Sequence, residues 1–338
     1  MQRIPSLDGV RAISITLVVL CHLANWKHIS LSFPTVYGAL GVRIFFVLSG
    51  FLITKLLLRE HERSATISLR DFYIRRAYRI FPAAAVYLFV VAIIFRHQLR
   101  WYDIAMAALY LANMQSYPQW MLGHLWSLSI EEQFYLLWPF ALKTWFRHKS
   151  AILVGVMVFS PVFITALYFL HAHGGILGSL PVYADALAIG CLLAIFAPRL
   201  PRVPGYAAVF MTSMVFLVPL FAANTQTKTL LQLFVLQPLL HVSIAGVVLH
   251  VIQVPYQFLN WGPVAWLGRI SYSLYLWQQV FCFNPSFKLG YSLALLAVGC
   301  ACLSYYFVEQ PMLRLREKRV QKLEQAAAPM LERTSSAA

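Results

Sequence analysis

Two ionisable residues interrupt the first apolar run of the chain. Arg11 and His22 lie in the stretch SLDGVRAISITLVVLCHLANW, residues 6–26. Their spacing of eleven residues places them on one face of an α-helix, about 16 Å apart along its axis. An imidazole can take a proton from a hydroxyl near neutral pH, and a guanidinium can bind phosphate. Because ionisable groups inside a membrane usually face water or polar partners, the pair predicts a functional cavity. The alternatives are that Arg11 reaches the membrane surface and that His22 is a neutral imidazole bonded to another helix.

A second cluster of cations occurs in YIRRAYRIFP, residues 73–82, where Arg75, Arg76 and Arg79 lie within about one helical turn. Arg75 and Arg79 are four residues apart and share a helix face. Taken alone, the cluster favours an ordinary cytoplasmic anchor of a membrane helix. Together with Arg11 near the same membrane surface, it predicts a basic mouth that binds phosphate groups.

The segment HLWSLSIEEQFYLLWP, residues 124–139, carries two adjacent carboxylates, Glu131 and Glu132. They stand near the expected outer start of a membrane span, where a helix N-terminus favours negative charge, so capping is one interpretation. The other is that one of them orients His22 or a substrate hydroxyl. Ser49 and Gly50, in FFVLSGFLIT, allow either close helix packing or the wall of a substrate tunnel.

Three further signals are weaker. Asp185 is a carboxylate in an apolar run with no obvious partner in the sequence. Glu309 stands beside Pro311 at a membrane boundary, where an ion pair with the basic tail and a catalytic role are both possible. His171 and His173 form a His-x-His pair, but with no third ligand in view we expect no metal site.

The composition sets the class of protein that must position these residues. Hydrophobic residues make up 60% of the chain and charged residues only 12%. Soluble domains average about 45–50% apolar and about 25% charged residues, so an integral membrane protein is predicted. The net charge of +15 comes from short clusters between apolar runs. That distribution is typical of cytoplasmic loops and argues against a nucleic-acid partner.

Eleven apolar runs are long enough to be considered as membrane spans. The basic loops are compatible with cytoplasmic termini only if one run does not cross, and the weakest is WYDIAMAALYLANMQS, residues 101–116. We therefore predict an all-α bundle of about ten transmembrane helices, with 101–116 as a re-entrant or interfacial helix. Residues 1–315 would form this domain and 316–338 a basic, partly disordered cytoplasmic tail. The expected spans are 8–28, 36–58, 77–96, 129–146, 151–171, 181–197, 206–223, 230–252, 266–284 and 289–308.

Six segments in this order resemble the acyltransferase-3 family, the integral-membrane acyltransferases that acetylate bacterial surface sugars and some secondary metabolites. They are LDGVRAISITLVVLCH, GVRIFFVLSGFLIT, FYIRRAYRIFPA, HLWSLSIEEQFYLLWP, GRISYSLYLWQ and YYFVEQP, which together extend over about residues 5–315. The resemblance implies a ten-helix domain that uses cytoplasmic acyl-CoA as co-substrate, with no permanently bound cofactor.

The resemblance also implies roles for particular residues. The Arg-(ten residues)-His signature of the family falls on Arg11 and His22, and its Glu-x-Pro element falls on Glu309 and Pro311. The arginines after the second helix, expected to hold the CoA phosphates, fall on Arg75, Arg76 and Arg79. The chain departs from the family in two places: it has Gln278 where many members have His, and Tyr183 where many have Arg.

The function favoured by these observations is transfer of an acyl group, most commonly acetyl in this family, to a hydroxyl of a carbohydrate or glycolipid acceptor. The enzyme would be a multi-pass protein of the cytoplasmic (inner) membrane, with His22 as base and Glu131 or Glu132 as orienting group. A transporter that uses His22, Asp185 and Arg11 as a relay is the alternative. The acceptor, the acyl chain, an acyl-histidine intermediate and the oligomeric state stay open.

Overall fold

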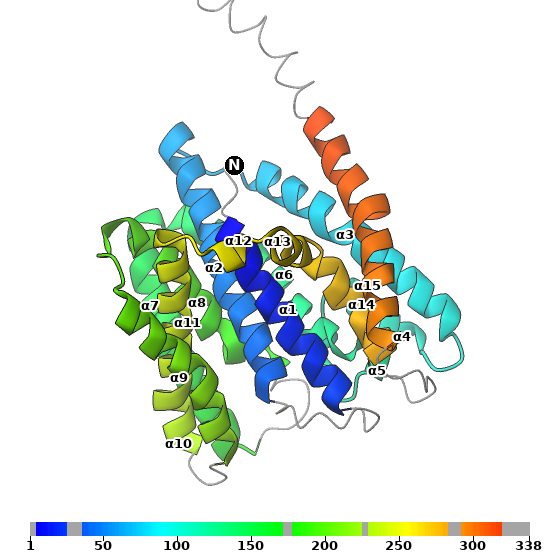
Figure 1. Ribbon diagram of the computed structural model, residues 1–338, viewed down its shortest axis with the longest axis horizontal. Helices are drawn as coiled ribbons and strands as arrows, with labels where there is room; N and C mark the ends of the chain where they lie inside the picture. Colours follow the sequence, from blue (N-terminus) through cyan, green and yellow to red (C-terminus); the bar gives the residue numbers. More distant parts are fainter. Residues whose placement is uncertain (1–4, 26–35, 172–177, 225–228, 283–291, 320–338) are drawn as a thin grey trace, which may run out of the picture.

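The computed structural model describes residues 5–25, 36–171, 178–224, 229–282 and 292–319, and most of these are helical with no β-strand among them (Figure 1). The remaining residues, which include His173 and residues 320–338 of the expected tail, lie outside the described part. The principal helices are α1 (Pro5–Asn25), α2 (Val36–Ser64), α3 (Leu69–Ile94), α4 (Trp101–Ala108), α5 (Trp120–Gly123), α6 (Leu125–Thr144), α7 (Lys149–Phe169), α8 (Leu180–Phe196), α9 (Gly205–Asn224), α10 (Thr229–Leu231), α11 (Gln237–Gln253), α12 (Gln257–Asn260), α13 (Gly262–Arg269), α14 (Ser271–Cys282) and α15 (Ser292–Ser304).

Seven helical segments in the described ranges are long and apolar enough to cross a membrane. They comprise α1, α2, α3, α7, α8, α9 and α11, some with a short helical extension. The structure therefore agrees with the all-α membrane class, whereas the expected count of about ten spans is not confirmed.

Three of the expected spans are not among these seven. The helix α6 is 20 residues long but carries Glu131, Glu132 and Lys143. The expected span 266–284 is divided into α13 and α14, with Ile270 between them. The expected span 289–308 begins outside the described residues, and from Ser292 the chain is helical as α15, the π-helical turn Tyr305–Glu309 and a further helical stretch to residue 319.

The segment 101–116, expected not to cross, forms the eight-residue helix α4 and the 3₁₀ turn Ala112–Met114. At 1.5 Å per residue, α4 extends about 12 Å, well short of the ~30 Å of the hydrocarbon core.

The helix α1 runs through the middle of the view in Figure 1 and contacts α2, α12, α13 and α14. Glycines allow the close approaches: a side chain at Gly9 would collide with the backbone of Leu259 in α12, and one at Gly268 with the backbone of Asp8. The first two turns of α1, which carry Arg11, are thereby fixed against the short helices that precede α14.

Contacts along α2 define the directions of its neighbours. Gly41 meets Ser14 and Gly38 meets Cys21, so α1 and α2 are antiparallel. Ser49 contacts Glu131 and Thr54 contacts Trp138, so α6 runs in the same direction as α2. We call the end of the bundle where α1 begins the arginine end, and the end where α1 finishes, near His22, the histidine end.

The helix α8 also runs in the same direction as α2, since Phe46 contacts Tyr183 and Gly50 meets the carbonyl of Leu187. The beginnings of α2, α6 and α8 therefore lie at the histidine end, on the side of the bundle where α1 finishes.

Candidate active site

A cavity of about 110 Å³, room for several water molecules, lies among α1, α2, α3, α6, α13 and α14. Its apolar wall comes mainly from α2, through Val42, Phe45, Phe46, Leu48, Leu52 and Ile53. Its polar lining consists of Arg11, Ser49, Arg76, Arg79, Ser127, Glu131, Tyr135, Arg269, Ser271, Tyr272 and Tyr275. The structure thus brings together residues that lie more than 260 positions apart in the chain.

Four of the lining residues are arginines, supplied by α1, α3 and α13. Arg11 pairs with Asp8 across 3.5 Å and lies within electrostatic reach of Arg76 and Arg79. Glu131 is the one carboxylate that lines the cavity in the described part of the chain. Because cations outnumber carboxylates there, the cavity is suited to a ligand with several negative charges.

Glu131 is held in place by two hydroxyl groups. Its Oε1 accepts a hydrogen bond of 2.8 Å from Ser49 Oγ, and its Oε2 accepts one of 3.1 Å from Tyr135. The Arg76 guanidinium lies over the Tyr135 ring, 3.7 Å from its centroid, and interacts electrostatically with Glu131. Ser49, Glu131 and Arg76, expected separately from the sequence, therefore form one network.

The neighbouring Glu132 differs from Glu131. It does not line the cavity, and its buried Oε1 makes no hydrogen bond to the described residues. Its charge lies near Arg76 and Tyr110. Of the two carboxylates, Glu131 is the one in position to face a ligand.

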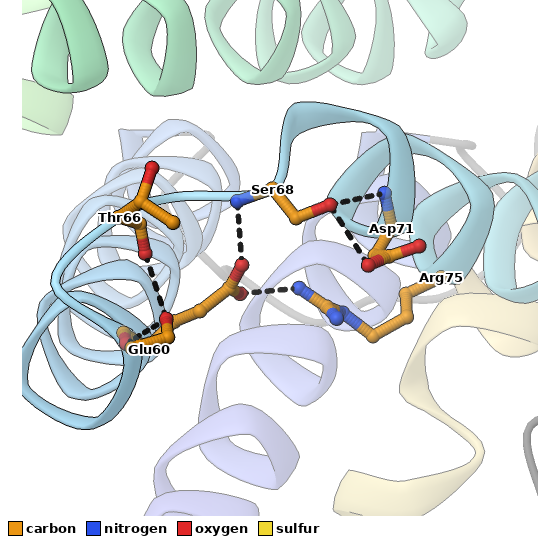
Figure 2. Close-up of polar contacts among 6 residues, drawn as sticks. Glu60, Thr66, Ser68, Asp71 and Arg75 are labelled. Atoms are coloured by element: carbon orange, nitrogen blue, oxygen red, sulfur yellow. Dashed lines mark hydrogen bonds and ion pairs between the residues drawn. The ribbon is translucent and has the colours of Figure 1, made fainter. Parts of the chain in front are cut away.

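Arg75 points away from the cavity, into the turn between α2 and α3 (Figure 2). Its Nη2 donates to Glu60 Oε2 over 2.6 Å, and Glu60 Oε1 accepts from the backbone N–H of Ser68 over 2.7 Å. Ser68 in turn caps α3 by accepting from Asp71 N. Arg75 and Arg76 point about 100° apart on the helix. Arg75 and Arg79 share a helix face, as expected, but the carboxylate of Glu60 holds the Arg75 guanidinium outside the cavity that Arg79 lines.

His22 is bonded to Gln278, one of the two residues at which the chain departs from the family that it resembles. Its Nδ1 lies 2.6 Å from Gln278 Oε1. Because an amide oxygen only accepts hydrogen bonds, Nδ1 carries the proton and Nε2 is the basic ring nitrogen. Gln278 therefore fixes the tautomer of His22 that is suited to a general base.

His22 does not line the arginine-rich cavity, which reaches the histidine end through Ser127 and Tyr275. Tyr275 donates to the carbonyl of His124 over 2.8 Å and pairs with Ser127 Oγ at 2.6 Å. The His124 ring is 5.3 Å from that of Tyr275 and interacts electrostatically with His22. A layer of Tyr275 and His124 thus lies between the cavity and His22.

The remaining predicted residues have specific partners. Gly50 packs against the carbonyl of Leu187 in α8, which is close helix packing rather than a tunnel wall. Asp185 pairs with His241 Nδ1 at 3.1 Å. Glu309 accepts a hydrogen bond from Ser273 and interacts electrostatically with Arg79. Among the described residues, no group of three His, Cys, Asp or Glu side chains is placed to hold a metal ion.

Sequence reasoning missed Arg269, Tyr272 and Tyr275 as cavity residues. All three occur in GRISYSLYLWQ, so the signal was present in a segment already noted for its family resemblance. An arginine directly before a membrane helix is typical of a membrane anchor, and the sequence alone does not show which helices pack beside it.

The fold and the cavity are those of a multi-pass membrane protein with an arginine-rich cavity. A family model described as an acyltransferase domain matches residues 4–308, and the chain belongs to this acyltransferase-3 family.

Three curated relatives show similarity over most of this chain. The chain is 31% identical to SACOL0978 of Staphylococcus aureus (strain COL), provisionally named an O-acetyltransferase, over 92% of this chain and 57% of the relative. It is 33% identical to the peptidoglycan O-acetyltransferase OatA of Listeria monocytogenes, over 81% of this chain and 49% of the relative. It is 30% identical to YrhL of Bacillus subtilis, provisionally named a peptidoglycan O-acetyltransferase, over 91% of this chain and 55% of the relative. The chain spans about half the length of these relatives, and no solved structure matches it.

Proposed function

We propose that the chain transfers an acyl group, acetyl in the first instance, from acyl-CoA to a hydroxyl of a carbohydrate-type acceptor. The observation that carries the proposal is the convergence of Arg11, Arg76, Arg79 and Arg269 on one cavity with a long apolar wall. Guanidinium groups bind phosphate oxygens in pairs, and the apolar wall suits the less polar arm that joins the CoA phosphates to the thioester. The acceptor class is supported by the relatives named for O-acetylation of peptidoglycan.

The proposal assigns different tasks to the two ends of the bundle. The arginine end, which also carries Arg59 and Arg63 in the last turns of α2, would face the cytoplasm and bind the CoA phosphates. Both termini would then be cytoplasmic, in a cytoplasmic membrane. The thioester would extend past Tyr275 and His124 toward His22, about 16 Å along α1 from Arg11. The contact of Tyr275 with the cavity on one side and His124 on the other supports this path.

The reaction follows from the tautomer of His22. Nε2 takes the proton of the acceptor hydroxyl as its oxygen attacks the thioester carbonyl carbon. The tetrahedral intermediate collapses to the ester and expels the CoA thiolate, which receives the proton from the imidazolium. The positioned base contributes about 10²–10⁴-fold to the rate.

A covalent variant of this mechanism places the acyl group on His22 before it reaches the acceptor. Radiolabelled acetyl-CoA added without acceptor distinguishes the two. Label retained on the wild-type protein and lost in His22→Ala supports the acyl-histidine, while unlabelled protein supports direct transfer.

The proposed function is tested by comparing surface-glycan masses of cells with and without the protein. We expect an increment of one acyl group per modified sugar, removed by mild alkali as an ester is. Unchanged glycans, together with CoA-independent solute flux in vesicles of the purified protein, would contradict acyl transfer and support the transporter.

A further inference from the structure

Three charged or titratable side chains gather at the histidine end, on the side of α2 that faces α8 and α11. They are Arg43 in α2, Asp185 in α8 and His241 in α11. Asp185 Oδ2 lies 3.1 Å from His241 Nδ1, and the Arg43 charge lies near Asp185 and Tyr183. Each residue lies within about the first two turns of its helix. The reaction proposed above uses none of them.

Arg43 is the unusual member of this group. It is half-buried, and its guanidinium donates no hydrogen bond to any residue that the structure describes. A cation within a membrane span is costly unless it faces water or a polar ligand. The Asp185–His241 pair alone could be structural, but Arg43 keeps donors that bond to no described side chain and are available to a polar ligand.

Aromatic rings lie directly beside this group. The rings of Trp126 and Tyr183 are 4.9 Å apart, and both meet Phe46, at 6.2 and 6.1 Å. Phe46 lines the arginine-rich cavity, whereas Trp126 and Tyr183 are half-buried beyond it. The aromatic cluster therefore forms the boundary between the cavity and the Arg43 group.

This combination matches the surface of a sugar ring, which presents C–H faces to aromatic rings and hydroxyl groups to charged side chains. Arg43 supplies donors and Asp185 an acceptor. The carboxylate of Asp185 offsets the positive charge of Arg43, so the group is poorly suited to bind a phosphate. An acyl chain is also disfavoured, because it makes no favourable contact with charged groups. We propose that Arg43, Asp185, Trp126 and Tyr183 form the subsite that binds a sugar ring of the acceptor. The inference rests on the proposed acyl transfer and adds where the acceptor lies.

The test uses full-length purified protein in lipid vesicles, acetyl-CoA, and a tetrasaccharide of N-acetylglucosamine as the acceptor probe. We expect Tyr183→Ala to raise the KM for the tetrasaccharide about 3- to 10-fold, the loss expected for one aromatic contact. The KM for acetyl-CoA should stay within about twofold, and Tyr183→Trp should restore the KM for the sugar. Tyr168→Ala, at an exposed tyrosine of α7, is the matched control.

The outcomes separate this inference from the proposed function. Wild-type transfer to the tetrasaccharide with no change in Tyr183→Ala or in Arg43→Gln overturns the acceptor subsite alone. A rise in the KM for acetyl-CoA equal to that for the sugar assigns the cluster a structural role and overturns it too. Absence of acyl transfer by the wild type, with no binding of the tetrasaccharide, contradicts both proposals.

Discussion

The arginine end and the histidine end of the bundle hold polar groups in different ways. At the arginine end, α1, α3 and α13 direct four guanidinium groups into one cavity that has a single lining carboxylate among the described residues. At the histidine end, the imidazoles have individual partners: His22 lies against Gln278 and His241 against Asp185. An excess of one charge suits the binding of a counter-charged ligand, whereas a paired, neutral imidazole suits proton transfer.

This difference predicts that substitutions at the two ends change different kinetic constants. Substitutions at the arginine end should act mainly on the KM for acyl-CoA, and substitutions around His22 mainly on kcat. Arg75 is next to Arg76 in the sequence but lies outside both regions. Its substitution should change neither the KM for acyl-CoA nor kcat.

The largest effect is expected from His22→Ala, which removes the base. We predict that kcat falls about 10²–10⁴-fold while the KM for acetyl-CoA changes less than about threefold, because the arginines are untouched. The measurement is a steady-state transfer assay on vesicles that contain equal amounts of inserted protein. Turnover near that of the wild type would remove His22 from the chemistry.

The next largest effect is expected from Arg76→Ala and Arg79→Ala, each of which removes a donor from the cavity. A hydrogen bond to a charged group is worth about 1.5–3 kcal/mol, so the KM for acetyl-CoA should rise about 10- to 100-fold. The kcat at saturating acetyl-CoA should fall much less. An unchanged KM in both variants would make these arginines membrane anchors.

A smaller effect is expected from Gln278→Ala, which removes the hydrogen-bond partner of His22 Nδ1. Without the acceptor the imidazole is free to adopt the other tautomer, and we predict a loss in kcat of about tenfold. Gln278→His retains an acceptor nitrogen and should keep most of the activity. Equal activity of the Ala variant and the wild type would show that this pair does not set the tautomer.

The smallest kinetic effect is expected from Arg75→Gln, the matched control for the cavity arginines. Its bond to Glu60 is partly exposed, and such pairs contribute about 1 kcal/mol or less. Both kinetic constants should stay within about twofold of the wild type, while Tm in detergent falls by a few degrees at most. If Arg75→Gln raised the KM for acetyl-CoA as much as Arg76→Ala does, the separation of the two side chains would be wrong.

Hydropathy and charge were sufficient to predict an all-helical membrane protein and to select 101–116 as a segment without a long helix. They did not reveal that 266–284 is interrupted at Ile270, because a break between two apolar helices leaves the hydropathy high. Loop charge alone also does not fix the number of spans, which depends on how helices such as α6 are buried against others.

The site was predictable where residues act through their own helix and less so where they depend on distant partners. From the eleven-residue spacing of Arg11 and His22 we expected both to face one cavity, but of the two only Arg11 lines it. The partner of His22 is 256 residues away and that of Asp185 is on α11, so local sequence gives no signal for either. Arg75 and Arg76 are indistinguishable as residue types, and it is their distant partners that separate them, Glu60 for Arg75 and Tyr135 for Arg76.

A structure of the protein bound to acetyl-CoA, determined by cryo-electron microscopy in lipid, is the most direct measurement. The account predicts that phosphate oxygens contact the guanidinium groups of Arg76 and Arg79, with the thioester extending past Tyr275 toward His22. Acetyl-CoA bound outside this cavity, or with its thioester directed away from His22, would contradict the account.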